Sequence, residues 1–250
     1  MQSWCTLCAL SAPGLNLNTV SESLALAVGL VTHADPNLVD IVMLSLQVSL
    51  TATFFAAYIG LPLGAAIAVG RFPGRDALIV VLNAMMGLPP VVVGLVVYLL
   101  LSRSGPLGSY GLLFTPGAMV IAQTILIAPI IAALTRQIVA DAWLEYSEQL
   151  TSLGASTYRA ATTLLWDTRF SLATVLLAGF GRAIAEVGAV MIVGGNINGV
   201  TRVMTTTIAL ETSKGDLPLA LALGLVLIAI VVLVNAIAQM TRGWAKARFG

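Results

Sequence analysis

The sequence predicts an all-α integral membrane protein with about five transmembrane helices. Of its 250 residues, 58% are hydrophobic and only 9% are charged, and its mean hydropathy is +0.98. A soluble domain has about a quarter of its residues charged, so this chain has too few charges to cover a water-facing surface. Apolar stretches also recur along the chain, each long enough for a helix to cross a bilayer, which takes about 20 residues.

The first 37 residues are expected to be a leader and a short helix. Residues 1–20 lack the basic region and cleavage site of a signal peptide. Residues 21–32 are too few to cross a membrane and are expected to lie along its outer interface. Cys5 and Cys8 form a lone CxxC, and the single histidine, His33, cannot complete a metal cluster with them, so we expect no metal or redox site.

Two apolar stretches follow, at residues 38–69 and 76–101. The first is longer than a bilayer requires, so it is expected to tilt, and Pro62 is expected to kink it. The second carries Pro89 and Pro90 at its centre, where two backbone donors are missing. The helix must break there, inside the protein rather than against lipid, which favours two half-spans. A purely structural kink and a gate of a transport pathway are both open interpretations of this break.

Three further spans are predicted at residues 117–140, 170–193 and 217–240, with a smaller helix at 203–213 before the last. We treat 38–242 as one transmembrane domain and 243–250 as a basic tail. With five crossings, one side of the membrane receives Arg71, Arg75, Arg136, Arg159, Arg169, Arg242, Lys246 and Arg248, whereas Arg103, Arg202 and Lys214 lie on the other. Basic residues favour the cytoplasmic side, so the N-terminus is expected outside and the C-terminus inside.

A polar segment, residues 141–167, interrupts the apolar sequence and is predicted to be cytoplasmic. Its pattern favours two short amphipathic helices separated at Gly154, which is expected to take a left-handed conformation. Asp141 is expected to cap the first helix and Ser156 the second. Two interpretations are open: a surface loop that rests on the protein's own helix ends or on the bilayer, or a docking element for a partner.

Part of this segment resembles a known motif. Residues 148–155, EQLTSLGA, are similar to the EAA motif of type I ABC-transporter importer permeases, in which a glycine follows an acidic residue by six positions. Two positions depart from the motif: Gln149-Leu150 replaces Ala-Ala, and Trp166-Asp167 replaces Leu-Pro. In that family the loop is a coupling helix that sits in a cleft of a cytoplasmic ATPase. The resemblance implies this role for Glu145, Glu148, Leu153, Gly154, Ala155 and Ser156.

Further stretches resemble the molybdate, tungstate and sulfate branch of the same family. Residues 87–94, GLPPVVVG, and 181–189, GRAIAEVGA, are similar to signatures of molybdate-type permeases. Residues 195–206, GNINGVTRVMTT, and 209–216, ALETSKGD, look most like the tungstate permeases. The resemblance covers approximately residues 38–242, and it implies tungstate as the substrate, with molybdate or sulfate as the alternative.

The resemblance also implies the partners and the location. Two copies of the chain would form the pathway in a prokaryotic inner or plasma membrane, surrounded by lipid, above a pair of cytoplasmic ATP-binding subunits. An extracytoplasmic protein would deliver the oxyanion. The chain has no GxxxxGK[ST] motif, so ATP and Mg²⁺ would belong to the partner; we expect no cofactor on this chain and no enzymatic activity of its own. A net charge of +1 argues against nucleic-acid binding.

Two groups of polar residues are candidates for the transport pathway. Arg182 and Glu186 lie within a predicted span, where a charge is costly, so they either neutralise each other or provide positive potential for a dianion. At the outer end of that span, hydroxyl and amide donors suit an oxyanion, but a capped loop that touches the binding protein is the favoured interpretation. The residues of this predicted outer loop are Asn196, Asn198, Thr201, Arg202 and Thr205.

Two other classes of membrane protein explain the sequence less well. A secondary transporter would account for a broken second span but not for a cytoplasmic element split by a glycine. An intramembrane protease would need a histidine or paired carboxylates within the spans, and the sequence offers neither. If the protein is a permease, its gate is expected where Pro89 and Pro90 meet the fourth span.

Overall fold

The computed structural model describes residue 29 and residues 36–249, with side chains as far as residue 240. The regular structure within these residues is helical: α2 Pro36–Val69, α3 Arg75–Met85, α4 Pro90–Leu101, η1 Gly108–Tyr110, α5 Pro116–Ser152, α6 Thr157–Asp167, α7 Arg169–Ile184, α8 Gly188–Gly194, α9 Met204–Lys214 and α10 Leu217–Phe249. Cys5, Cys8, His33 and, apart from Gly29, the helix predicted at residues 21–32 lie outside this description.

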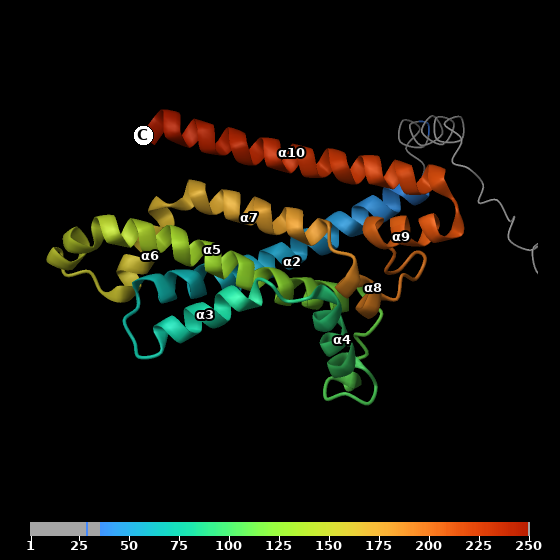
Figure 1. Ribbon diagram of the computed structural model, residues 1–250, viewed down its shortest axis with the longest axis horizontal. Helices are drawn as coiled ribbons and strands as arrows, with labels where there is room; N and C mark the ends of the chain where they lie inside the picture. Colours follow the sequence, from blue (N-terminus) through green and yellow to red (C-terminus); the bar gives the residue numbers. More distant parts are fainter. Residues whose placement is uncertain (1–28, 30–35, 250) are drawn as a thin grey trace, which may run out of the picture.

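The long helices run along the length of the molecule, whereas α4 turns away from them (Figure 1). Three helices, α2, α5 and α10, are each long and apolar enough to cross a membrane, and the bent pairs α3–α4 and α7–α8 bring the total to as many as five spans. The described part of the chain therefore agrees with the predicted five crossings. The C-terminal end of α10 lies at the same end of the molecule as α6, and α8 and α9 lie at the other.

Small residues bring α2 and α5 into close contact. Ala52 and Ala56 are fully buried, and a Cβ at Gly64 would lie 2.5 Å from the carbonyl oxygen of Ala132 in α5. A Cβ at Gly60 would likewise meet the side chain of Ile131 at 2.9 Å. Small residues at every fourth position let membrane helices approach backbone to backbone, which replaces the hydrophobic driving force that lipid does not supply. Pro62 lies between these two glycines, inside α2, and the helix continues past it to Val69.

The predicted break of the second span is confirmed. Helices α3 and α4 meet at a 98° bend, with Pro89 in an extended conformation and Pro90 as the first residue of α4. Proline is well suited to a first helical position because no intrahelical bond needs its nitrogen. Helix α4 packs on α8, and a Cβ at Gly94 would lie 2.8 Å from the Cα of Ala189. The two stretches that resemble molybdate-type permeases therefore lie against each other.

One predicted boundary is wrong. The third span does not end at residue 140 but continues as α5 to Ser152, so Asp141 lies inside a helix and does not cap one. No glycine or proline interrupts residues 130–152, and Val139 and Ala142 stay buried on the same apolar stripe, so nothing stops the helix at the membrane surface. The predicted fifth span, residues 217–240, is confirmed as the apolar part of α10, and the helix continues to Phe249.

The fourth span, predicted as one helix over residues 170–193, is bent. Helix α7 ends at Ile184, α8 begins at Gly188, and the two helices meet at 58°. Glu186 lies in this break, where its side chain accepts a hydrogen bond from the backbone nitrogen of Ala189 at 3.3 Å. That carboxylate offers the first turn of α8 an acceptor outside the regular helical pattern, which favours ending one helix and starting another.

Candidate functional site

The turn between α5 and α6 is held by hydrogen bonds around Gly154. This glycine has φ +68°, as predicted, and its nitrogen donates to the carbonyl of Thr151 at 3.0 Å. The nitrogen of Ala155 donates to the carbonyl of Leu150, also at 3.0 Å. This pattern closes a helix whose next residue is left-handed. A Cβ at Gly154 would meet nothing within 4 Å, so the backbone conformation, rather than space, calls for glycine here.

Helix α6 begins at the predicted cap and folds back on the bundle. The Ser156 hydroxyl accepts a hydrogen bond from the nitrogen of Arg159 at 3.4 Å, which confirms the cap. The inner face of α6 contributes Ala160 and Leu164, each 1% exposed, to a cluster with residues of α2 and α5. The interpretation that the apolar face rests on the protein's own helices is therefore correct for this face. The other members of the cluster's core are Ala65, Ala68, Val69, Val139 and Ala142.

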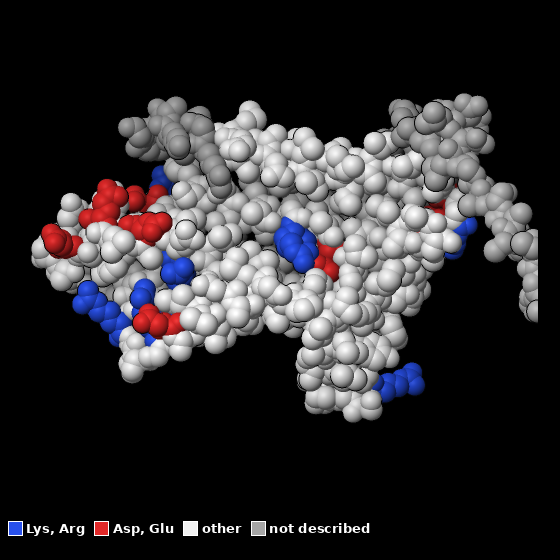
Figure 2. Space-filling view, viewed as in Figure 1, with Lys and Arg blue, Asp and Glu red and all other residues white. Residues whose placement is uncertain are grey.

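The outer face of the same turn is exposed and carries large apolar side chains beside acidic ones. Leu153 is 81% exposed and Tyr158 is 78% exposed, while Glu145 and Glu148 are exposed on the last turns of α5. Figure 2 shows acidic and basic side chains gathered at this end of the molecule, over the region of α5 and α6 in Figure 1. An apolar group that protrudes among charges is typical of a protein-docking surface.

Trp166 and Asp167, which replace the Leu-Pro of the family motif, lie at the joint between α6 and α7. The helices are separated by a single residue, Thr168, whose hydroxyl donates to the carbonyl of Leu164 at 2.7 Å. The Arg169 guanidinium donates to the carbonyl of Trp166 at 2.8 Å and lies 5.0 Å from the centre of the Trp166 ring. A cation over an indole ring is stabilising, so this contact holds the joint without the usual Leu-Pro.

Arg182 and Glu186 form an ion pair across the bend between α7 and α8. The Arg182 Nη1 and the Glu186 Oε2 are 2.5 Å apart, although Glu186 lies beyond the end of α7. The Glu186 side chain is only 5% exposed, whereas that of Arg182 is 41% exposed. The pair is therefore asymmetric, with a buried carboxylate fixed by its neighbours and a guanidinium that reaches the protein surface.

Backbone carbonyls at this bend receive hydrogen bonds from two side chains. The Gln123 amide nitrogen, in α5, donates to the carbonyl of Ala183 at 3.1 Å, and the Thr205 hydroxyl, in α9, donates to that of Glu186 at 2.8 Å. A broken membrane helix requires such partners because no water is available in the hydrocarbon core. Gln123 is 4% exposed and is not among the predicted site residues, although an amide in the middle of an apolar stretch indicates a buried hydrogen bond.

The Pro89–Pro90 break, where the gate is predicted, also lies beside the bend between α7 and α8. A Cβ at Gly188, the first residue of α8, would be 2.9 Å from the side chain of Val91, in the first turn of α4. The Pro89–Pro90 break is thus adjacent to the α7–α8 break, and two interrupted spans meet at one place.

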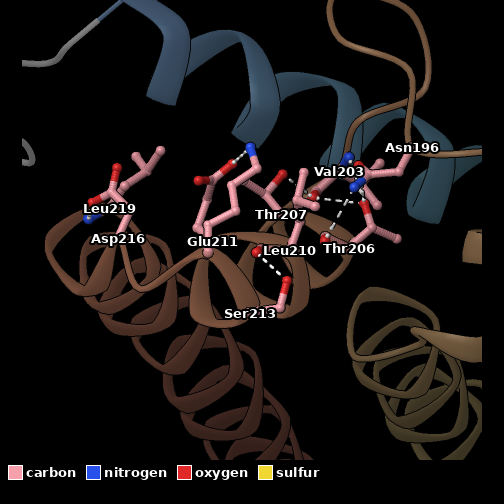
Figure 3. A network of polar contacts seen from close by, with 10 residues as sticks. Asn196, Val203, Thr206, Thr207, Leu210, Glu211, Ser213, Asp216 and Leu219 are labelled. Atoms are coloured by element: carbon pink, nitrogen blue, oxygen red, sulfur yellow. Dashed lines mark hydrogen bonds and ion pairs between the residues drawn. The ribbon is translucent and has the colours of Figure 1, made fainter. Parts of the chain in front are cut away.

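Three residues of the predicted outer loop, Asn196, Thr201 and Thr205, donate to backbone carbonyls of the chain. The Thr201 hydroxyl donates to the carbonyl of Gly194 at 2.5 Å and accepts from the nitrogen of Ile197 at 3.0 Å. Asn196 and Thr206 are joined by two hydrogen bonds, and Figure 3 shows them turned toward each other next to Val203. These hydrogen bonds hold the backbone of the loop in place. Asn198 and Arg202 differ, because both line a small pocket.

Among the described residues, no group of three or more His, Cys, Asp or Glu side chains could hold a metal ion. The main structural features are the exposed turn between α5 and α6, two adjacent helix breaks, and a hydrogen-bonded loop at the opposite end of the molecule.

Comparison with known proteins decides the family. No protein-family model matches the chain. A tungstate uptake system permease protein TupB of Peptoclostridium acidaminophilum is 42% identical over 218 residues, which are 87% of this chain and 96% of that protein. The chain belongs to the permease family of ABC transporters. It is thus a multi-pass membrane subunit, and ATP hydrolysis resides in a separate subunit.

Two further relatives extend the comparison. A probable anion ABC transporter permease protein of Haloferax volcanii is 41% identical over 218 residues, covering 85% of this chain and 94% of the relative. The sulfate transport system permease protein CysW of Escherichia coli K12 is 28% identical over 175 residues, covering 67% of this chain and 60% of CysW. Similarity to the permeases thus extends over most of the described helices.

Proposed function

We propose that this permease forms the membrane pathway of an ATP-driven tungstate importer. The observation that carries the proposal is the 42% identity, over nearly its whole length, to a tungstate uptake permease. A second tungstate permease, from Campylobacter jejuni, is 41% identical over 157 residues. The sulfate permease CysW is less similar, at 28% identity, so we prefer tungstate as the substrate. Molybdate or sulfate is the alternative. The transmembrane domain is assigned to residues 38–242.

The α5–α6 turn is proposed to dock on the ATP-binding subunit. Leu153 protrudes at its tip, Gly154 fixes the reversal of the chain, and Ala155 and Ser156 begin the return. Glu145 and Glu148 give the same surface an acidic rim. A protruding leucine supplies the apolar anchor of an interface, and acidic side chains around it supply orientation and partner choice. ATP and Mg²⁺ bind to that partner in this scheme.

Arg182 is proposed to face the pathway between two copies of the chain. The middle of the face drawn in Figure 2 is largely uncharged, except for a basic group beside an acidic one. A half-exposed guanidinium within a membrane span is costly against lipid, so a second copy or a water-filled path is expected to cover it. Such a group attracts a dianion, and the neighbouring Glu186 weakens the attraction enough for the ion to leave. This arrangement supports a homodimer.

The adjacent helix breaks are the proposed gate. Pro89 and Pro90 begin α4, and α4 packs on α8 through Gly94 and Ala189. Interrupted helices meeting at one place can change their mutual angle with little loss of hydrogen bonding, because their ends already lack intrahelical partners. ATP binding to the partner and ion delivery from outside would each favour one of the two arrangements, and this difference couples them.

Reconstitution tests the proposal. The permease is placed in liposomes with its ATP-binding subunit and with the extracytoplasmic binding protein, and uptake of tungstate, molybdate and sulfate is measured with and without ATP. We expect ATP-dependent uptake in which tungstate outcompetes the other two ions. Uptake by the permease alone, without the ATP-binding subunit, would contradict an importer. Preferential uptake of molybdate or sulfate would change the assigned substrate but not the proposed mechanism.

A further inference from the structure

We propose that a small pocket between α2 and the α8–α9 loop receives an acidic loop of the extracytoplasmic binding protein, whose carboxylate pairs with Arg202. This inference rests on the proposed function, since it assumes that such a protein delivers the ion. It goes further by naming the contact surface and the chemistry that recognises the partner.

The pocket has a volume of about 190 Å³ and lies at the end of the molecule opposite the docking turn. Its apolar floor is formed by Ile41 and Leu44 of α2. The polar part comes from both sides, with Asp40 on α2 and Arg202 on the loop. Its remaining lining residues are Asn37, Asn198, Gly199 and Val200.

Arg202 is the group in this pocket that most needs a partner. Its Nε is buried and has no hydrogen-bond partner among the described residues. The ion pairs within the described chain are Arg182–Glu186 and Lys214–Glu211, so Arg202 and Asp40 are not paired with each other. Arg202 is only partly buried and lines the pocket, so other N–H groups of its guanidinium can be reached from there. A carboxylate in the pocket can accept charge-assisted hydrogen bonds from them.

The pocket suits a polypeptide better than a free oxyanion. Asp40 lines the same small volume, and its negative charge repels a dianion. The hydroxyls that would otherwise bind an oxyanion are turned inward, since Thr201 donates to Gly194 and Thr205 donates to Glu186. A protein loop can instead present a carboxylate to Arg202 and a backbone or side-chain N–H to Asp40. It can also cover the apolar floor.

The loop that carries Arg202 is also preorganised. Hydrogen bonds within residues 194–206 fix its backbone, and the nitrogen of Met204, two residues after Arg202, donates to the Ser45 hydroxyl of α2 at 2.8 Å. Little conformational entropy is then lost when a partner binds, which favours a docking surface over a flexible loop.

Direct binding measurements test the inference. The complete permease–ATPase complex is held in nanodiscs, and the Kd of the purified, tungstate-loaded binding protein is measured for the wild type, for Arg202→Gln and for Asn198→Asp. We expect Arg202→Gln to raise Kd by at least about tenfold, the loss typical of one charge-assisted contact. Asn198→Asp should raise Kd as well, because it places a negative charge in front of an acidic partner. Arg103→Gln is the matched control, since Arg103 is an exposed arginine on another loop.

Three results would overturn the inference. The first is unchanged binding by both pocket variants. The second is an equal effect of Arg103→Gln, which would indicate general electrostatic attraction. The third is binding of free tungstate to the wild-type complex that Arg202→Gln abolishes, which would make the pocket an ion site. Asn198→Asp changes an exposed side chain, so it keeps the test valid if Arg202→Gln fails to fold.

The same samples distinguish this inference from the proposed function. If wild-type complexes show ATP-dependent uptake while both pocket variants bind the binding protein normally, only the pocket assignment fails. If the wild type shows no ATP-dependent uptake in the presence of the binding protein, the importer proposal itself fails.

Discussion

The Thr205 hydroxyl donates a hydrogen bond to the backbone carbonyl of Glu186, 2.8 Å away, and thereby joins α9 to the bend between α7 and α8. Glu186 is at the same time paired with Arg182. A short helix at one end of the molecule is therefore connected, through a single side chain, to the ion pair within the fourth span. Both residues are buried, so the contact is also shielded from competing water.

Replacing Thr205 by valine removes this donor and leaves a buried carbonyl without it. We expect Thr205→Val to lower stability by about 1–3 kcal/mol, the cost of an unsatisfied buried polar group. Thermal unfolding in detergent measures the effect, and Thr205→Ser, which keeps the hydroxyl, is the control. A valine variant as stable as the wild type, with an unchanged bend, would show that the contact contributes little.

The two charges of the Arg182–Glu186 pair can be separated by a double-mutant cycle. Arg182→Gln leaves a buried carboxylate without its cation and should destabilise the protein strongly. Adding Glu186→Gln removes the orphaned charge, so the double variant should recover most of the lost stability.

Uptake by the same variants separates structure from transport. If Arg182 supplies potential to the pathway, the stable double variant still transports tungstate more slowly, or with a higher KM, than the wild type. Full uptake by the double variant would assign the pair a structural role alone.

The α2–α5 contact predicts that Gly64 tolerates no side chain. A Cβ there lies 2.5 Å from a backbone carbonyl, which cannot move aside as a flexible side chain does. Gly64→Ala should therefore lower the unfolding temperature and the yield of folded protein, by an amount corresponding to about 1–3 kcal/mol. Gly224→Ala is the matched control, since a Cβ at Gly224 meets nothing within 4 Å. Equal behaviour of the two variants would contradict the close packing.

Substitutions at Gly154 test whether the left-handed turn itself is needed for docking, independently of the folding of the helices. Gly154→Val should strain the turn, because a β-branched residue disfavours positive φ, whereas Gly154→Asn should be tolerated. Co-purification with the ATP-binding subunit measures docking, and circular dichroism checks the helices. We expect valine to weaken docking at least about tenfold with the bundle intact, since a turn distorted at its tip no longer presents its anchor residue. Normal docking by the valine variant would remove the turn from the interface.

Hydropathy, proline and glycine positions were enough to predict much of this fold. The apolar stretches, the break before Pro90 and the conformation of Gly154 follow from local chemistry, and each is observed. The end of α5 and the bend of α7–α8 do not, because tertiary contacts decide them. Val139 and Ala142 extend α5 by packing on other helices, and the bend is held by residues distant in sequence, Gln123 and Thr205.

The candidate sites show the same division. Residue types located the Arg182–Glu186 pair and the outer loop, but the direction in which each hydroxyl points depends on the folded loop. Thr201 and Thr205, which as sequence could bind an oxyanion, bind carbonyls instead. Asp40, far away in sequence, lines a pocket together with Arg202 only because α2 and the α8–α9 loop meet.

Helix α5 runs as a single helix from Pro116 to the turn around Gly154, with Pro129 inside it. Its 37 residues correspond to about 55 Å at 1.5 Å per residue. Its contact with Gly64 lies at Ala132, partway along this length, where backbone meets backbone. The contact with α2 also extends beyond this point, since a Cβ at Gly60 would meet Ile131. No proline or glycine lies between Ala132 and Ser152, so a displacement of the turn would reach α2 through unbroken helix before it meets Pro129.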